Sequence, residues 1–144
     1  CEDAERTGQL ALTRQCYVTL ADVAAQLDRP QLRAQCLYHQ SRLLFVDQRY
    51  AEAVPILEEG ESFCAANELQ LERSEIAVSL GVAHHGLGDL TKAKGLFERA
   101  EQLCESCGNY FGLVTCLAYK FGLFNCWLYA TDSEISVVNT HCTH

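Results

Sequence analysis

Methionine is absent from this chain of 144 residues, and only two prolines, Pro30 and Pro55, occur in it. So few prolines favour long helices over loops, because proline breaks helix interiors and is common in turns. Basic residues are also scarce: 11 Lys and Arg against 19 Asp and Glu give a formal net charge of −8. Nucleic acid is therefore not expected as a partner, since a phosphate-binding surface needs clustered Lys and Arg.

The sequence also lacks the motifs of common catalytic and nucleotide-binding sites. It contains no Ser-His-Asp order, HExxH zinc motif, P-loop or glycine-rich dinucleotide turn. Gly86-Leu87-Gly88 is a short glycine-rich stretch, but it falls between two expected helices and not after a strand. No enzymatic activity and no cofactor are expected.

The nine cysteines are odd in number, and several occupy apolar helix positions, which argues against a closed disulfide framework. This use of cysteine favours the cytoplasm. Cys104-x-x-Cys107 has the spacing of a zinc ligand pair, but no second pair at compatible spacing exists. The favoured interpretation places Cys104 in the core and Cys107 at a helix end, with no metal; a zinc or redox site stays the lesser alternative. A composite site would draw on Cys116, Cys126, His141, Cys142 and His144.

The sequence repeats itself with a period of 40 residues. Residues 88–93 follow residues 48–53 by 40 positions, and those follow residues 8–13 by 40. Cys64 and Cys104 keep the same register. A fixed period of this length indicates stacked repeats, each of which buries its apolar face against its neighbours. Such a stack points to a binding scaffold and away from a single-pocket enzyme.

Apolar residues spaced by three and four predict helices, and the short turns between them predict that paired helices pack antiparallel. The expected fold class is all-α, a right-handed α-solenoid of antiparallel helix pairs. The six expected helices cover residues 8–27, 31–46, 50–66, 71–87, 90–104 and 110–130. The expected domain, residues 1–130, comprises a partial repeat 1–30, repeats 31–70 and 71–109, and a half repeat 110–130, followed by an irregular tail 131–144.

Small residues recur where helices would touch, and bulky residues recur beside them. In the repeat 71–109, Gly81, Ala93 and Ala100 permit close backbone approach and Phe97 fills the adjacent space. With Leu80-Gly81 and the turn Gly88-Asp89-Leu90, these residues resemble the tetratricopeptide repeat (TPR) superfamily. The 40-residue period is similar to the longer-helix subclass of rapsyn, kinesin light chains and the spindle-orientation adaptors. The preceding repeat supplies Leu37, Ser41, Leu44, Tyr50, Ala53, Leu57 and Gly60 at the matching places.

The resemblance implies an adaptor that binds a peptide or helix of a protein partner in a concave groove. The family's carboxylate clamp of Lys and Asn and the asparagine ladder of the spindle adaptors are absent, so neither of those binding modes is expected. Arg42 offers a bidentate fork for a carboxylate, beside Tyr38 and His39. A purely structural spacer stays the alternative. The implied groove residues are Gln35, Tyr38, His39, Arg42, Phe45, Glu75, Ser79, His85, Tyr119 and Asn125, with Val78, Val82, Ala118 and Gly122.

The stretch 109–130 carries a single charge, Lys120. Its length would suit a membrane span, but a lysine near the middle, with Gly112, Gly122 and Asn125, argues against one. Because exposed apolar patches of this size are rarely left bare, we expect it to meet the tail, a second copy, or the next part of a longer protein. Its apolar residues are Phe111, Leu117, Phe121, Phe124, Trp127 and Leu128.

Overall fold

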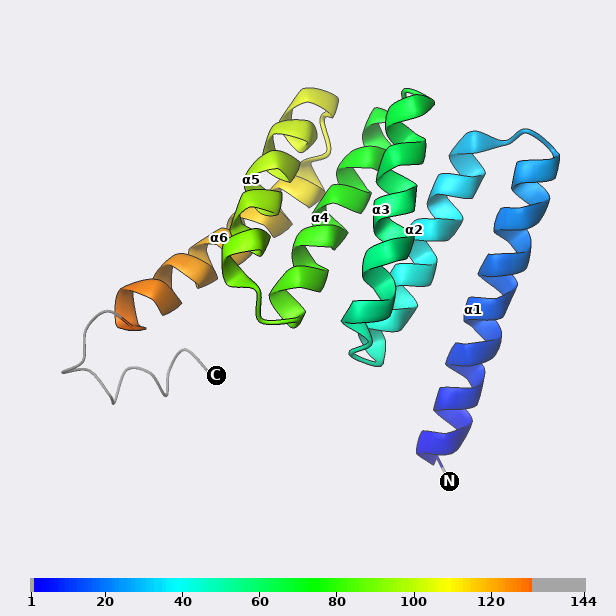
Figure 1. The fold of residues 1–144 in the computed structure, drawn as a ribbon, viewed down its shortest axis with the longest axis horizontal. Coiled ribbons are helices and arrows are strands. Elements are labelled where there is room, and N and C mark those ends of the chain that lie inside the picture. The colour runs from blue at the N-terminus through cyan, green and yellow to red at the C-terminus, as the bar shows by residue number, and fades with distance from the viewer. Residues whose placement is uncertain (1, 131–144) are drawn as a thin grey trace.

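In a computed structural model of the chain, residues 2–130 are described, with side chains from 5 to 122 (Figure 1). These residues form six α-helices and no strand, which confirms the expected all-α class and number of helices. The expected tail 131–144 lies outside the described residues. The helices are α1 (Glu2–Gln26), α2 (Pro30–Val46), α3 (Tyr50–Ala66), α4 (Gln70–Gly86), α5 (Leu90–Cys107) and α6 (Tyr110–Ala130).

The helices follow one another in a row, from α1 at one end to α6 at the other (Figure 1). Each helix packs against the next in sequence, and α4 also contacts α2 and α6. Among the described residues, α1 packs against α2, and its Arg14 also pairs with Glu52 of α3 at 3.9 Å. Contacts restricted to near neighbours in sequence are those of a helical repeat, in which each unit is covered by the adjacent ones.

The five connections between these helices close in the same way. In each, a single residue adopts a positive φ, and the backbone N–H of the next residue bonds to a carbonyl five residues back, as Arg49 does to Leu44 at 2.9 Å. This bond satisfies a carbonyl left free at the helix end, in the manner of a Schellman motif. The positive-φ residues are Asp28 (54°), Gln48 (57°), Glu68 (57°), Gly88 (82°) and Gly108 (77°), each 20 positions after the last.

Small residues lie at the close contacts between helices, as the sequence predicts. Gly60 of α3 approaches Ile76 of α4, whose Cδ1 would be 3.0 Å from a Cβ at residue 60. Gly81 of α4 faces the ring of Phe97 of α5, which is fully buried. Leu57 is fully buried in the neighbouring cluster. The remaining small residues of the repeat pattern, Ser41, Ala53, Ala93 and Ala100, are also fully buried.

Two helix boundaries differ from expectation by more than one residue. Helix α1 begins at Glu2 and not at Gly8, because Glu-Asp-Ala-Glu-Arg at 2–6 consists mostly of good helix formers, with its acidic residues near the N-terminus where the helix dipole favours them. Helix α5 runs on to Cys107, since the left-handed residue that ends it is Gly108. No helix within residues 2–130 is long and apolar enough to cross a membrane.

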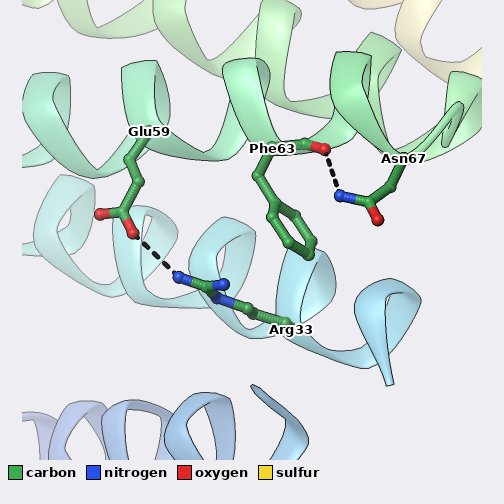
Figure 2. A network of polar contacts seen from close by, with 4 residues as sticks. All are labelled: Arg33, Glu59, Phe63 and Asn67. Carbon is green, nitrogen blue, oxygen red and sulfur yellow. Dashed lines mark hydrogen bonds and ion pairs between the residues drawn. The ribbon is translucent and has the colours of Figure 1, made fainter. Parts of the chain in front are cut away.

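Polar contacts on the surface join α2 to α3 (Figure 2). Arg33 pairs with Glu59 at 3.2 Å, and its guanidinium carbon lies 4.6 Å from the ring centroid of Phe63. At the end of α3, the Asn67 side chain donates to the Phe63 carbonyl at 2.9 Å. Exposed pairs of this kind contribute at most about 1 kcal/mol each, so the buried small-residue contacts set the helix arrangement.

Candidate functional site

A pocket of about 670 Å³ lies between α2, α4 and α6. This volume falls within the range of ligand-binding pockets in proteins. Aromatic and aliphatic side chains make up most of the lining, with a few polar groups among them. The lining residues are Tyr38, Arg42, Phe45, Val46 and Tyr50 from α2 and α3, Glu75, Val78, Ser79 and Val82 from α4, Asn109 just before α6, and Phe111, Gly112, Thr115 and Tyr119 from the N-terminal half of α6.

Some of the groove residues implied by the TPR resemblance lie outside this pocket. Gln35 is exposed elsewhere on α2, and His39 is exposed and stacks on Tyr17 of α1, with 5.2 Å between ring centroids. His85 is half-buried and meets Tyr119 edge to face. The side chain of Asn125 lies outside the described residues. Those that line the pocket are Tyr38, Arg42, Phe45, Glu75, Val78, Ser79, Val82 and Tyr119.

Along α6 the lining differs from the positions that the repeat register implies. Ala118 is exposed away from the pocket, and Phe111 and Thr115 line it together with Tyr119. Arg42, Ser79 and Thr115 line the pocket at spacings of 37 and 36 residues, about one helical turn short of the 40-residue repeat. The pocket therefore crosses the helices diagonally, from the C-terminal half of α2 to the N-terminal half of α6.

Sequence reasoning missed Phe111 and Thr115, although a signal for them exists. Positions 111, 115 and 119 are spaced by four, which places them on one face of a helix. Counting back from Tyr119 by four and by eight positions along this face leads to Thr115 and Phe111. The pocket is also lined by Val46, Tyr50 and Asn109, which lie at or just beyond helix ends. The spacing of apolar residues along one helix does not predict which residues near its ends face a neighbouring helix.

Arg42 is held by Tyr38, one turn before it on α2. Its Nη1 donates to the Tyr38 hydroxyl at 2.9 Å, and its guanidinium carbon lies 5.7 Å from the Tyr38 ring centroid. A cation over an aromatic face is attracted to the ring, which restrains the flexible arginine side chain. Because arginine has five N–H donors, donors remain for a ligand at this exposed position.

Glu75 contributes a half-buried carboxyl group to the pocket wall. Burial raises the pKa of Glu75, the negative charge of Glu72 raises it further, and the positive charge of Arg42 opposes both. Glu72 is itself buried in α4 and accepts a hydrogen bond from Gln31 Nε2 at 2.8 Å. The Glu75 carboxyl makes no hydrogen bond or ion pair with another described side chain, so it can accept one from a ligand.

Asn109 joins α6 to α4 at the edge of the pocket. Its Oδ1 accepts the backbone N–H of Gly112 at 3.0 Å, which caps the start of α6. Its Nδ2 donates to the hydroxyl of Ser74 at 2.9 Å, and that hydroxyl donates to the Leu71 carbonyl at 2.6 Å. Ser74 is fully buried in α4. The Asn109 side chain thus fixes the position of the first turn of α6 relative to α4, and Phe111 lies in that turn.

The cysteines of α5 and α6 are placed as packing residues. Cys104 and Cys116 are fully buried in one cluster, and Cys107 is the last residue of α5, as predicted. Burial raises the pKa of Cys116 to about 12, so its thiol stays protonated. Among the side chains that the structure describes, no group of three His, Cys, Asp or Glu could hold a metal. The remaining residues of the composite site, Cys126, His141, Cys142 and His144, lie outside that part.

No protein-family model matches the chain, and a comparison with curated proteins finds no match. The resemblance to the TPR superfamily therefore depends on the repeat pattern and on the small and bulky residues that keep its register.

Proposed function

We propose that this protein is an interaction scaffold, an adaptor that binds a peptide or helix of a protein partner in the pocket between α2, α4 and α6. One observation carries the proposal: the first helices of three successive repeats contribute to a single pocket of about 670 Å³. In this proposal the helices form antiparallel pairs in a right-handed, TPR-like solenoid, the pocket lies on its concave face, and the protein acts in the cytoplasm without catalysing a reaction.

The chemistry of the lining supports a peptide ligand. Tyr38, Phe111 and Tyr119 offer large contact areas with few rotatable bonds, and such residues dominate binding energy at interfaces. Arg42 supplies donors, and Glu75 supplies an acceptor on the facing helix. A peptide backbone and its side chains need both kinds of partner, so the lining suits an extended or helical segment with apolar anchors.

A displayed library of random peptides, selected on the purified protein, tests the proposal. Phe111 is 80% exposed and lines the pocket, whereas its neighbour Tyr110 is 75% exposed and lies outside the pocket. We expect Phe111→Ala to weaken a selected peptide by about tenfold or more, as loss of an aromatic anchor does. Tyr110→Ala is the matched control and should leave the affinity unchanged, measured by fluorescence polarisation with the labelled peptide.

The same experiment separates the adaptor from a structural spacer. Tyr38→Ala together with Arg42→Ala should reduce binding of the selected peptide as well, because these residues line the same pocket from α2, whereas Phe111 lines it from α6. A spacer would yield no selectable peptide, or only peptides that bind wild type, Phe111→Ala and the double variant equally. Either result would contradict the proposal.

A further inference from the structure

The two ends of the helix row carry exposed apolar side chains that the pocket does not use. On α6, Val114 and Leu117 are exposed and Phe121 is 69% exposed. On α1, Leu20 and Val23 are exposed and Leu27, just past its end, is 66% exposed. Within the described part of the chain, α6 packs only against α4 and α5, and α1 packs against α2 with one ion pair from Arg14 to Glu52 of α3, so neither of these apolar faces is covered.

The repeat register assigns different roles to these two helices. Helix α1 lies 40 residues before α3 and 80 before α5, so it takes the place of the second helix of a repeat. Helix α6 lies 40 residues after α4 and takes the place of a first helix. One end of the row therefore presents a second helix, and the other end presents a first helix.

The α4–α5 pair shows how a first helix meets the second helix of its own repeat. A Cβ built at Gly81 of α4 would lie 2.6 Å from the Phe97 ring of α5. One helical turn from the start of α4, the Ser74 hydroxyl contacts the Cys107 thiol at 3.5 Å. Ala77 lies between these two points and packs in the same buried cluster as Ala100.

Transferring these contacts by the repeat period leads to the exposed residues. Forty positions after Gly81, Ala77 and Ser74 stand Phe121, Leu117 and Val114 of α6. Eighty positions before Phe97, Ala100 and Cys107 stand Tyr17, Leu20 and Leu27 of α1. Apart from half-buried Tyr17, all are exposed. The two faces thus carry apolar groups at the positions that make contact within a repeat.

We propose that α6 of one copy binds α1 of a second copy in the arrangement of α4 on α5, which completes a repeat across the interface. Phe121 then meets Tyr17 of the second copy, Leu117 meets Leu20, and Val114 meets Leu27. Because the α6 side chains are larger than those of α4, the two helices lie farther apart than α4 and α5 do. The interface joins different surfaces of the two copies, so it extends into chains of copies.

Sedimentation equilibrium of the purified protein, from micromolar to millimolar concentration, tests this proposal. We expect wild type to form dimers and longer assemblies as concentration rises. Phe121→Asp and Leu20→Asp should each be monomeric, because each places a charge in the interface. Mixed together, they should form a one-to-one dimer and nothing larger, since the intact α1 of the first variant binds the intact α6 of the second.

Two control variants and a measurement of helicity separate a loss of assembly from a loss of folding. Tyr110→Asp changes an exposed aromatic residue of α6 outside the interface, and Leu12→Asp changes an exposed α1 residue whose equivalent, Lys92, is exposed on α5. Both should assemble like wild type, and circular dichroism should show equal helicity for all four variants.

Three outcomes would overturn the proposal: a wild type that is monomeric at every concentration, a Leu20→Asp variant that assembles normally, or a mixture of the two variants that stays monomeric. The second outcome would indicate pairing of α6 with α6. None of them bears on peptide binding in the pocket.

Discussion

The ring of Phe97 fills the space in which a side chain at residue 81 would stand. A Cβ added to Gly81 would lie 2.6 Å from Cε1 and 2.7 Å from Cδ1 of that ring, which is fully buried between α4 and α5. Because a closely packed ring has no room to withdraw, we expect Gly81→Ala to lower the free energy of unfolding by about 1–3 kcal/mol. Urea denaturation followed by circular dichroism measures the change.

Gly95 provides the matched control for that substitution. It is exposed in the interior of α5, and a Cβ built there has no atom within 4 Å. Gly95→Ala should therefore raise the free energy of unfolding by about 0.5–1 kcal/mol, since glycine weakens a helix relative to alanine. If Gly81→Ala were stabilising to the same extent, the close approach of α4 to Phe97 would be wrong.

The left-handed turn residues predict opposite effects at two equivalent positions. Gly88 has φ of 82° and Gln48 has φ of 57°, and only glycine adopts such values without steric cost. We expect Gly88→Ala to destabilise the protein by about 1 kcal/mol and Gln48→Gly to stabilise it by up to about 1 kcal/mol. The midpoints of urea unfolding report both, and a loss of stability at Gln48→Gly would contradict the shared turn geometry.

Reactivity toward an alkylating reagent should divide the cysteines. Cys16 is exposed, whereas burial raises the pKa of Cys64 to about 11 and that of Cys116 to about 12. Since the thiolate is the reactive form, we expect iodoacetamide at pH 8 to modify Cys16 while Cys64 and Cys116 stay unmodified until urea unfolds the chain. Peptide mass spectrometry measures each site. Native labelling of Cys116 at the rate of Cys16 would show that the α5–α6 contact opens readily.

The raised pKa of Glu75 predicts a pH-dependent effect on stability. The folded state holds the Glu75 proton more tightly than the unfolded state, so this group favours folding below its ordinary pKa and loses that contribution as pH rises through the raised value. Glu75→Gln should therefore raise the melting temperature at pH 7, and the gain should shrink as pH falls toward about 4. The exposed Glu105→Gln is the control for lost net charge. If Glu75→Gln raised the melting temperature equally at all pH values, the ionisation of Glu75 would not be the cause of the stabilisation.

Most of the fold could be predicted because the same pattern occurs repeatedly in one chain. The expected helices 31–46, 50–66, 71–87 and 110–130 agree with α2, α3, α4 and α6 within one residue. The turn geometry could not be predicted as completely. Glycine marks a left-handed residue at 88 and 108, and aspartate, which tolerates positive φ better than most residues, is a weaker signal at 28. Gln48 and Glu68 give no such signal, because these residue types rarely adopt positive φ. The repetition at 20-residue intervals therefore emerges only from the backbone.

The candidate pocket was less predictable, since the repeat register assumes that every first helix presents the same positions. Tyr119 of α6 stacks on Phe97 of α5 with 4.9 Å between centroids, while Thr115 and Phe111, one and two turns earlier, line the pocket with it. How far each helix is displaced along its axis depends on contacts such as this one between neighbours. A period within the sequence contains no information about that displacement.

The identical closure of all five described connections makes the helices interchangeable at their ends. Removing residues 50–89 would join the turn at Gln48 to α5, and both the turn geometry and the alternation of first and second helices would be kept. Removing only residues 50–69 would keep the turn but place α4 where a second helix belongs. Leu80 would then stand in the position of Gly60, and Ala77 in the position of Leu57, which leaves no bulky side chain opposite Ser41. Lengthening or shortening by whole pairs of helices is therefore compatible with this fold, whereas a change by one helix is not.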